Sequence, residues 1–492
     1  MQPDQAMPTS LSGKTNPIVI QGGMGVAVSN WVLAKTVAMR SQLGVVSGTA
    51  IDSVLVRRLQ DGDVGGHMRR AMAHFPFPDI AEDVLKRYFL AEGRAPGQAY
   101  KRLPMYTQVG SKFLRGVTVL GNFVEVFLAK EGHRGPVGVN LLTKVQMPNL
   151  ASLYGAMLAG VNYVLMGAGI PREIPGALDK FAEHKEAAIR FDVVGLGKDE
   201  AEFLRFDPME FYDDQPDPIA RPAFLPIIAS NSLATMLSKK ATGPVQGFVI
   251  EGPTAGGHNA PPRGTVHYSE DGEPIYGERD VVDLEKIRDI GLPFWVAGGA
   301  ATPERVEEIL ALGGAGVQVG TLFAYSKESG IESDMKREIL TKALKGEISV
   351  HTDPRASPTG FPFKVVQLDG TNAQEEVYLK RTRVCDLGYL REAYRQEDGG
   401  VGYRCASEPV DTYLKKDGAV EETVGRKCLC NALMADVGLP QIQKNGEVER
   451  PIITSGDELM TIGRFVQPGA LEYSATEVID YLLSKVRALE PS

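Results

Sequence analysis

The chain is poor in the features that mark secreted, membrane-spanning and nucleic-acid-binding proteins. Four cysteines in 492 residues are too few for a secreted disulfide framework. No apolar run reaches the roughly 18 residues of a membrane span, and the first 16 residues lack the apolar core of a signal peptide. A net charge of −9 argues against nucleic acid or an anionic membrane as the main partner. We therefore expect a cytoplasmic protein that acts on small molecules, and the sequence leaves a homo-oligomer open.

What the chain does have is glycine, 54 residues of it, in a composition that is 43% hydrophobic and 23% charged. This composition is typical of a soluble globular protein. Many of the glycines follow short apolar runs that have the length of buried strands. The eight runs are residues 17–21, 43–46, 136–142, 162–166, 224–229, 247–250, 293–297 and 316–319.

Most of these runs are followed by a segment with helical spacing of apolar residues, and repeated strand–helix units predict a parallel sheet. Eight units within residues 1–330 favour a closed (β/α)8 TIM barrel, with insertions near residues 91–121 and 185–222. A doubly wound open sheet is the alternative. However, no Gly-x-Gly-x-x-Gly follows the first run, which counts against a dinucleotide site of that fold.

The pattern changes at about residue 331. From there to residue 492 the sequence is charged and rich in turns, and it contains all four cysteines. We interpret residues 331–492 as a C-terminal extension packed on the barrel. Its segment from His351 to Phe363 either folds back over the mouth of the barrel or forms a surface linker.

A histidine after the sixth run is the best candidate for chemistry. Residues 250–259 read Ile-Glu-Gly-Pro-Thr-Ala-Gly-Gly-His-Asn, so a glycine-rich loop delivers His258 at the carboxyl end of a strand. In a β/α barrel, ligands bind at that end. The glycines let the backbone approach a ligand closely, because they have no Cβ.

Two further glycine motifs occupy the seventh and eighth strand ends. They are Ala297-Gly298-Gly299-Ala300 and Gln318-Val319-Gly320-Thr321. Loops after these two strands commonly bind phosphate in this fold, through bare backbone N–H groups and a helix N-terminus. The alternative is that the glycines only allow the chain to turn from strand to helix. The pair of motifs in these positions favours phosphate binding.

Four motifs in this order resemble the nitronate monooxygenase family, formerly called 2-nitropropane dioxygenase. These are Ile20-Gln21-Gly22-Gly23-Met24-Gly25, Ala255-Gly256-Gly257-His258, Ala297-Gly298-Gly299 and Val317-Gln318-Val319-Gly320-Thr321. The resemblance covers about residues 15–330. It implies an FMN-dependent barrel enzyme, related to FMN-dependent enoyl-acyl-carrier-protein reductases, that oxidises a small carbon acid such as an alkyl nitronate with dioxygen.

The resemblance also implies roles for individual residues. Gly22, Gly23 and Met24 would lie beside the isoalloxazine ring, and Asn140, at the third strand end, would hydrogen-bond the flavin. His258 would be the catalytic base, which suits an imidazole whose pKa lies near the working pH. The other residues expected to contact the cofactor are Glu251, Gly256, Gly257, Gln318 and the phosphate-binding Gly298, Gly299, Gly320 and Thr321.

This chain departs from the family at two positions. Members often have Gln where this chain has Glu251, and Glu where it has Thr254. A carboxylate near the flavin would disfavour an anionic reduced ring unless it is protonated or paired. Two other functions therefore stay open. One is an FMN-dependent enoyl-thioester reductase that uses NAD(P)H, and the other is a non-catalytic flavin- or metal-binding module that serves a partner.

The four cysteines fall within one short region, as Cys385, Cys405, Cys428 and Cys430. Their clustering predicts zinc or an iron–sulfur cluster. Their spacing is irregular, and the alternative is a set of buried thiols without a ligand.

Overall fold

The computed structural model describes residues 16–466, 469 and 471–487. Its main sheet has eight parallel strands in the order β1-β11-β10-β9-β8-β4-β3-β2. A parallel bridge between Ile20 and Leu43 joins the first strand to the last, with Gln21 N donating to Leu43 O and Leu43 N to Val19 O, both at 3.0 Å. The sheet is therefore a closed (β/α)8 TIM barrel, as predicted, and not an open doubly wound sheet.

All eight predicted runs are barrel strands. They are β1 Val19–Gln21, β2 Gly44–Ser47, β3 Val137–Leu142, β4 Tyr163–Gly167, β8 Ala223–Ile228, β9 Phe248–Glu251, β10 Phe294–Ala297 and β11 Gly316–Val319. Alternate strand residues point inward and fill the barrel, among them Leu165, Leu225, Val249 and Trp295. The Trp295 indole Nε1 donates to Pro17 O at 2.8 Å, so the interior is packed with side chains and is not a pore.

Helices surround this barrel. They are α1 Trp31–Met39, α2 Ile51–Gln60, α3 His67–Met72, α4 Pro78–Tyr88, α5 Lys112–Lys130, α6 Gln146–Leu158, α7 Ile174–Ala182, α8 Asn231–Lys240, α9 Leu284–Arg288, α10 Pro303–Ala311 and α11 Thr321–Ala324. Side-chain N-caps begin several of them: Asn30 caps α1, Ser230 caps α8 and Thr302 caps α10.

The first insertion was predicted at residues 91–121, but its C-terminal part is helical. Residues 91–111 are irregular, but α5 begins at Lys112 and is almost entirely buried. Its glycines look like helix breakers in the sequence, yet they allow close packing. A Cβ on Gly121 would lie 3.1 Å from the backbone of Asp52 in α2, and one on Gly116 would lie 3.1 Å from Ile80.

The second insertion has regular structure of its own. It contains β5 Ala187–Phe191, β6 Val193–Val194, β7 Glu202–Phe206 and the 3-10 helix η2 Pro208–Phe211. Strands β5 and β7 form an antiparallel pair. Strand β6 pairs with β14 (Glu392–Arg395), which pairs in turn with β15 (Val401–Arg404). The insertion therefore joins the C-terminal extension through a shared sheet.

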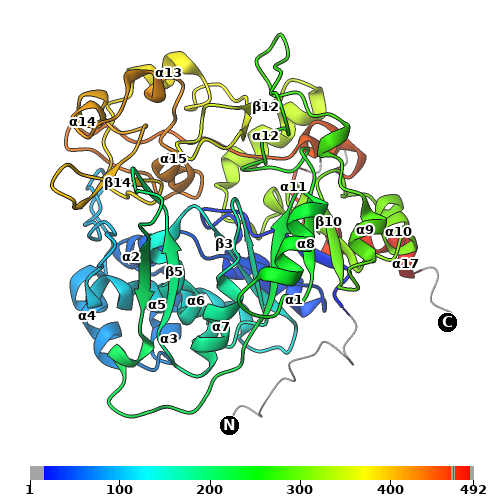
Figure 1. Cartoon of the computed structure of the whole chain (residues 1–492). Coiled ribbons are helices and arrows are strands. Elements are labelled where there is room, and N and C mark those ends of the chain that lie inside the picture. The colour runs from blue at the N-terminus through cyan, green and yellow to red at the C-terminus, as the bar shows by residue number, and fades with distance from the viewer. Residues whose placement is uncertain (1–15, 467–468, 470, 488–492) are drawn as a thin grey trace.

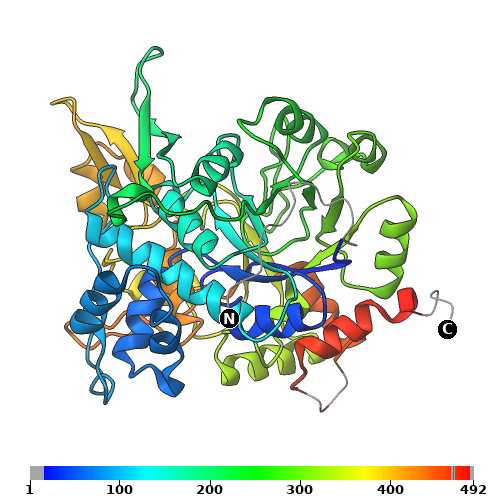
Figure 2. The same cartoon turned by 90° about the horizontal axis from the view of Figure 1, so that it is seen from below.

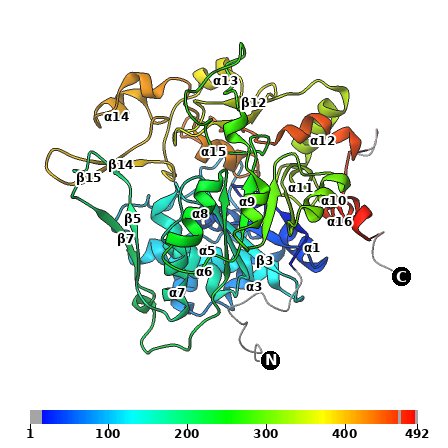
Figure 3. The same cartoon turned by 45° about the vertical axis from the view of Figure 1, so that its right-hand side comes forward.

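Residues 331–487 contribute further elements. Besides β14 and β15 they are α12 Ser333–Lys345, β12 Val350–Asp353, β13 Phe363–Val366, α13 Glu375–Lys380, α14 Val410–Leu414, α15 Leu429–Ala435, η5 Asp457–Arg464, α16 Ala475–Leu482 and α17 Ser484–Arg487. In Figures 1 and 3 the part from α13 to α15, coloured yellow to orange, lies over one end of the barrel. Within the described residues no helix is long and apolar enough to cross a membrane.

The end of the described chain returns to its beginning. Val478, Ile479 and Leu482 of α16 lie in one hydrophobic cluster with Leu33 and Val37 of α1. Arg40 and Asp480 form an ion pair between the same two segments. Figure 2 shows α16, in red, close to the blue α1. The extension thus packs against the outer helices as well as over the barrel mouth.

Candidate active site

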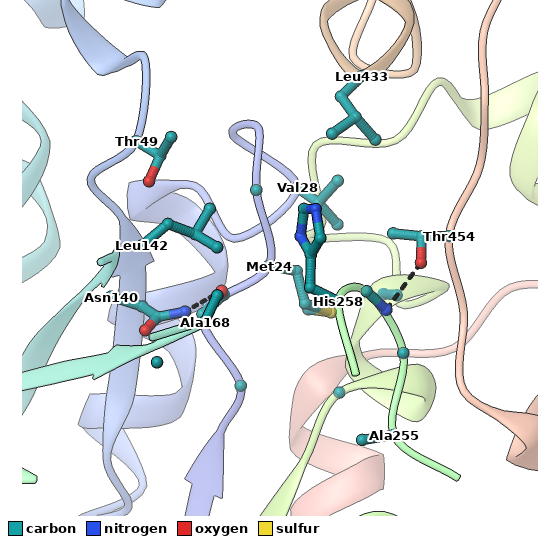
Figure 4. A pocket seen from close by; sticks show the side chains of 18 of the residues that line it. Met24, Val28, Thr49, Asn140, Leu142, Ala168, Ala255, His258, Leu433 and Thr454 are labelled. Carbon is teal, nitrogen blue, oxygen red and sulfur yellow. Dashed lines mark hydrogen bonds between the residues drawn. The ribbon is translucent and has the colours of Figure 1, made fainter. Parts of the chain in front are cut away.

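A cavity of about 230 Å³ opens where the barrel strands end. The loops after β1, β3, β9, β10 and β11 line it together with segments of the extension, and in Figure 4 Leu433 and Thr454 of the extension lie on the same side as His258. Twelve of the thirteen predicted catalytic and cofactor-binding residues line it. These are Gly22, Gly23, Met24, Asn140, Glu251, Gly256, Gly257, His258, Gly298, Gln318, Gly320 and Thr321. Gly299 is the exception.

The loop after β1 is held in place by buried polar side chains. Ser29 Oγ accepts from Met24 N and donates to Gly22 O, both at 2.8 Å. Asn140 Nδ2 donates to Gly23 O at 2.6 Å, so Asn140 supports this loop and does not cap the following helix. A Cβ on Gly23 would lie 2.2 Å from the Asn140 Cβ. Glycine is therefore required here for the close approach of β1 and β3.

The histidine loop is fixed by the extension. Gly257, at φ +82°, donates its N–H to Thr454 Oγ1 at 2.8 Å and accepts from Lys364 N at 3.0 Å. Asn259 N donates to Pro362 O at 2.9 Å, and a bridge links His258 to Phe363. The segment before β13 therefore folds back over the barrel mouth, as one of the two interpretations of the sequence predicted.

The His258 side chain is oriented by a hydroxyl group from the extension. Its Nε2 lies 2.7 Å from the Oγ of Ser357, a fully buried residue, and Ser357 Oγ lies 2.8 Å from Thr359 Oγ1. The Phe363 ring packs against the imidazole, with ring centroids 4.8 Å apart. Burial lowers the His258 pKa to about 4, below the near-neutral value expected from the sequence, so the ring is neutral at neutral pH but is a weaker base than a free imidazole. Figure 4 shows His258 and Asn140 on opposite sides of the cavity.

The predicted phosphate end is partly filled by the extension. Gly298 and Gly299 have φ of +83° and +65°, as a tight turn after β10 requires. However, the N–H of Ala301 at the start of α10 donates to Glu458 Oε1 at 2.7 Å, and Gly456 N donates to Thr321 Oγ1 at 3.1 Å. The Glu458 carboxyl therefore already accepts from a backbone N–H group that we expected to bind the phosphate.

The cavity carries no cationic side chain. Of the described residues that line it, none is lysine or arginine. Its acidic groups are Glu251, Asp436 and Glu458, and burial raises the pKa of each, to about 8 for Glu251. Burial in an apolar setting favours the neutral acid. Glu251 is therefore mostly neutral at pH 7, whereas the Glu458 carboxyl lies 3.5 Å from the guanidinium of Arg464.

The predicted metal site is not supported. Cys385, Cys405, Cys428 and Cys430 are free and line one small hollow beside the main cavity. Yet in the described part of the chain no group of three or more His, Cys, Asp or Glu is arranged to hold a metal ion. Burial raises the pKa of all four thiols, which favours the protonated form over the thiolate that binds metals. The irregular spacing in the sequence corresponds to buried thiols.

Sequence reasoning missed the residues that the extension supplies. Ser357, Thr454 and Glu458 lie 99, 197 and 157 positions from the barrel residues that they contact. The only signal in the sequence was the loop-like segment around Ser357.

Comparison with known proteins points in the same direction as the motifs. Residues 211–356 match the family model described as nitronate monooxygenase. This stretch contains the histidine loop and both glycine motifs of β10 and β11. A curated protein of Rhodococcus jostii (strain RHA1), (3aS,4S,5R,7aS)-5-hydroxy-7a-methyl-1-oxo-octahydro-1H-indene-4-carboxyl-CoA dehydrogenase, is 27% identical over 149 residues, which are 30% of this chain and 36% of that protein. The chain thus matches about a third of the relative's length.

Three solved structures align with most of this chain at low sequence identity. FabK from Thermotoga maritima has 16% identity and a TM-score of 0.46, covering 96% of this chain and 94% of that one. Nitroalkane oxidase from Streptomyces ansochromogenes has 15% identity and a TM-score of 0.43, covering 96% of each chain. The enoyl reductase domain of MlnA from Bacillus amyloliquefaciens has 10% identity and a TM-score of 0.48, also covering 96% of each chain.

TM-scores below 0.5 do not establish a common fold, so the barrel assignment rests on this chain's own strand order. The family model, by contrast, covers the part of the barrel that carries His258. The resemblance of this chain to the nitronate monooxygenase family, first seen in its glycine motifs, is thereby confirmed.

Proposed function

We propose that this protein is an FMN-dependent oxidoreductase that oxidises a small carbon acid, of the alkyl nitronate type, with dioxygen. The observation that carries the proposal is the position of His258. Its imidazole is neutral, lacks a cationic neighbour in the cavity, and faces the glycine loop of β1 and Asn140 across the space. Such a base, placed opposite a bare backbone surface, suits proton removal beside a flat cofactor.

The residues present fit a flavin. Asn140 Oδ1, Gln318 Oε1 and Asp436 Oδ1 line the cavity, and in the described part of the chain none of these buried atoms has a hydrogen-bond partner. Buried polar atoms in native proteins are nearly always paired, so these three favour a bound ligand with several polar edges. A Cβ on Gly257 would stand in open space, which leaves the backbone accessible to such a ligand.

We assign the holding of FMN to the residues that line the cavity. The ring would be held by Gly22, Gly23, Met24, Asn140, Glu251, Gly256, Gly257 and Gln318, and the phosphate by Gly298, Gly320 and Thr321. Gly299 would contribute the turn after β10 without lining the cavity. Bound FMN would accept two electrons from the substrate carbon and pass them to dioxygen. At the phosphate end, Glu458 has to be neutral or to turn away from Ala301 N.

His258 would act through Nδ1. Its Nε2 is engaged by Ser357, so Nδ1 is the nitrogen left for a substrate proton. In the neutral ring that accepts at Nδ1, Nε2 carries the hydrogen and donates to Ser357 Oγ, and the Ser357 hydroxyl can turn toward Thr359 Oγ1, 2.8 Å away. The two hydroxyls thereby stabilise the imidazolium without a charged partner. A cavity whose described lining has no lysine or arginine suits a neutral nitroalkane that becomes a nitronate in place.

The test is a visible spectrum of the purified protein, followed by anaerobic addition of a nitroalkane. We expect a flavin spectrum that bleaches with the nitroalkane, and oxygen consumption when air is readmitted. A protein that is colourless and takes up no FMN would refute the proposal. A flavoprotein that no nitroalkane or nitronate reduces would refute the substrate class.

A second candidate, reduction of an enoyl thioester by NAD(P)H, has one specific observation in its favour. The curated relative named above acts, by its name, on a coenzyme A thioester, and the cavity wall is largely apolar. The same anaerobic experiment separates the two functions. Bleaching by NAD(P)H, with reoxidation by an enoyl thioester in the absence of oxygen, would favour the reductase.

A further inference from the structure

Three apolar side chains face the cavity, and together we call them the leucine wall. Leu142 lies at the end of β3, Leu390 precedes β14 and Leu433 lies in α15, and all three line the cavity. They pack against a single buried cluster that includes Val145 and Tyr389. All three leucines are only half-buried. In Figure 4, Leu142 lies on the side of Asn140 and Leu433 on the side of His258, and both face the cavity.

This wall differs from the rest of the cavity. The flavin-side residues present backbone and amide groups, whereas the leucine wall presents no polar side chain. Two of its three leucines, Leu390 and Leu433, come from the extension. Exposed apolar surface of this kind gains free energy when an apolar group covers it, roughly in proportion to the area covered.

The charge of the cavity narrows the class of ligand. No lysine or arginine lines the described cavity wall, so a carboxylate, phosphate or other anion near the leucine wall would lose its hydration without gaining a partner. The carboxyl groups that line the cavity belong to Glu251, Asp436 and Glu458. An uncharged head group between His258 and Asn140 meets no such cost.

We propose that the substrate enters the cavity as an uncharged molecule, the protonated carbon acid, and that its aliphatic arm lies among Leu142, Leu390 and Leu433. The inference rests on the proposed function for the position of the reacting head group beside His258. The extension thus selects the substrate through its apolar surface, and chain length is the property that it selects.

The experiment is a calorimetric titration of the FMN-loaded protein with straight-chain primary amides from butanamide to octanamide. These probes are uncharged and are not carbon acids of useful strength, so binding is measured without turnover. We expect affinity to rise about fourfold for each added methylene, because burial of one methylene contributes about 0.8 kcal/mol. Carboxylates of the same lengths, at pH 7, should bind at least about tenfold more weakly than the amides.

Variants locate the arm. Leu433→Gln keeps the size of the side chain but makes it polar, and should reduce the gain per methylene to less than about twofold. Leu142→Gln changes the leucine that comes from the barrel and should reduce the gain per methylene in the same way. It provides a second measurement if Leu433→Gln misfolds. Leu379→Gln is the control, because Leu379 lies on the extension, is 66% exposed and does not line the cavity. Its titration series should match that of the native protein.

Two outcomes overturn the inference: amide affinity that does not change with chain length, or carboxylates that bind as tightly as amides. Retention of the full slope in both leucine variants also overturns it. Failure of the proposed function looks different. If no carbon acid is turned over but the amide series keeps its slope, the proposed oxidation is wrong and the uncharged, aliphatic ligand class stands. If FMN does not bind, the same titration on the flavin-free protein tests the leucine wall alone.

Discussion

The two sides of the cavity are built in different ways. On the barrel side, glycines expose backbone, and the amides of Asn140 and Gln318 have buried oxygens that find no partner among the described residues. The extension contributes side chains instead: the Ser357 hydroxyl contacts His258, and Leu390 and Leu433 present apolar surface. The barrel side is suited to a large flat cofactor, and the extension side to a substrate and to the orientation of the base. The predictions below test this division.

The largest effect is expected for the base. In His258→Asn the side chain remains polar but cannot accept a proton near neutral pH. We expect kcat to fall by about 10² to 10⁴, with the FMN content unchanged, as measured by steady-state oxygen consumption and flavin absorbance. His267→Asn is the control, because His267 is exposed and does not line the cavity. Loss of flavin along with activity would place His258 on the cofactor side instead.

The hydroxyl that orients the base comes next. Ser357→Ala removes the partner of Nε2 and should lower kcat about tenfold, which corresponds to the loss of one hydrogen bond of about 1.4 kcal/mol. FMN content and KM should change little, and the acid limb of the pH profile should move to lower pH because the base is weaker. Ser357→Thr keeps the hydroxyl and should recover most of the activity. Equal loss in both variants would indicate a packing role only.

The residue at the end of β9 tests the cofactor side. Burial raises the Glu251 pKa to about 8, so its carboxyl is neutral at pH 7 and ionises as the pH rises through 8. A negative charge beside the flavin should then disfavour its reduction. We expect the native rate of flavin reduction to fall up to about tenfold between pH 7 and pH 9. Glu251→Gln should abolish this alkaline limb. The acid limb, set by the lowered His258 pKa of about 4, should persist.

The smallest effect is expected at the phosphate end. Glu458 accepts from Ala301 N, where the FMN phosphate is expected. Glu458→Gln removes the negative charge and should tighten FMN binding by about three- to fivefold, measured by fluorescence titration of the flavin-free protein. Glu308→Gln, on the exposed face of α10, should leave FMN affinity unchanged. Weaker FMN binding in Glu458→Gln would show that this carboxyl supports the loop and does not compete with the cofactor.

The same division explains what the sequence could predict. Strand–glycine–helix units are local patterns, so all eight barrel strands and most residues of the barrel rim could be recognised. Ser357, Thr454 and the leucine wall could not, because the chain returns to the barrel over 99 or more positions without a periodic pattern. The start of α5 was obscured by its glycines, whose role is close helix packing. The cysteines are near neighbours in sequence, but proximity alone does not create metal-ligand geometry.

The pairing of the histidine loop with residues 362–364 has a consequence for synthesis on the ribosome. The ribosome synthesises the histidine loop about 100 residues before β13, which pairs with it. The separation between α1 and its partner helix α16 is larger still. An incomplete chain therefore contains every barrel strand but cannot hold its imidazole in position. We therefore expect a chain that ends before residue 357 to be inactive, because it lacks the hydroxyl that contacts His258.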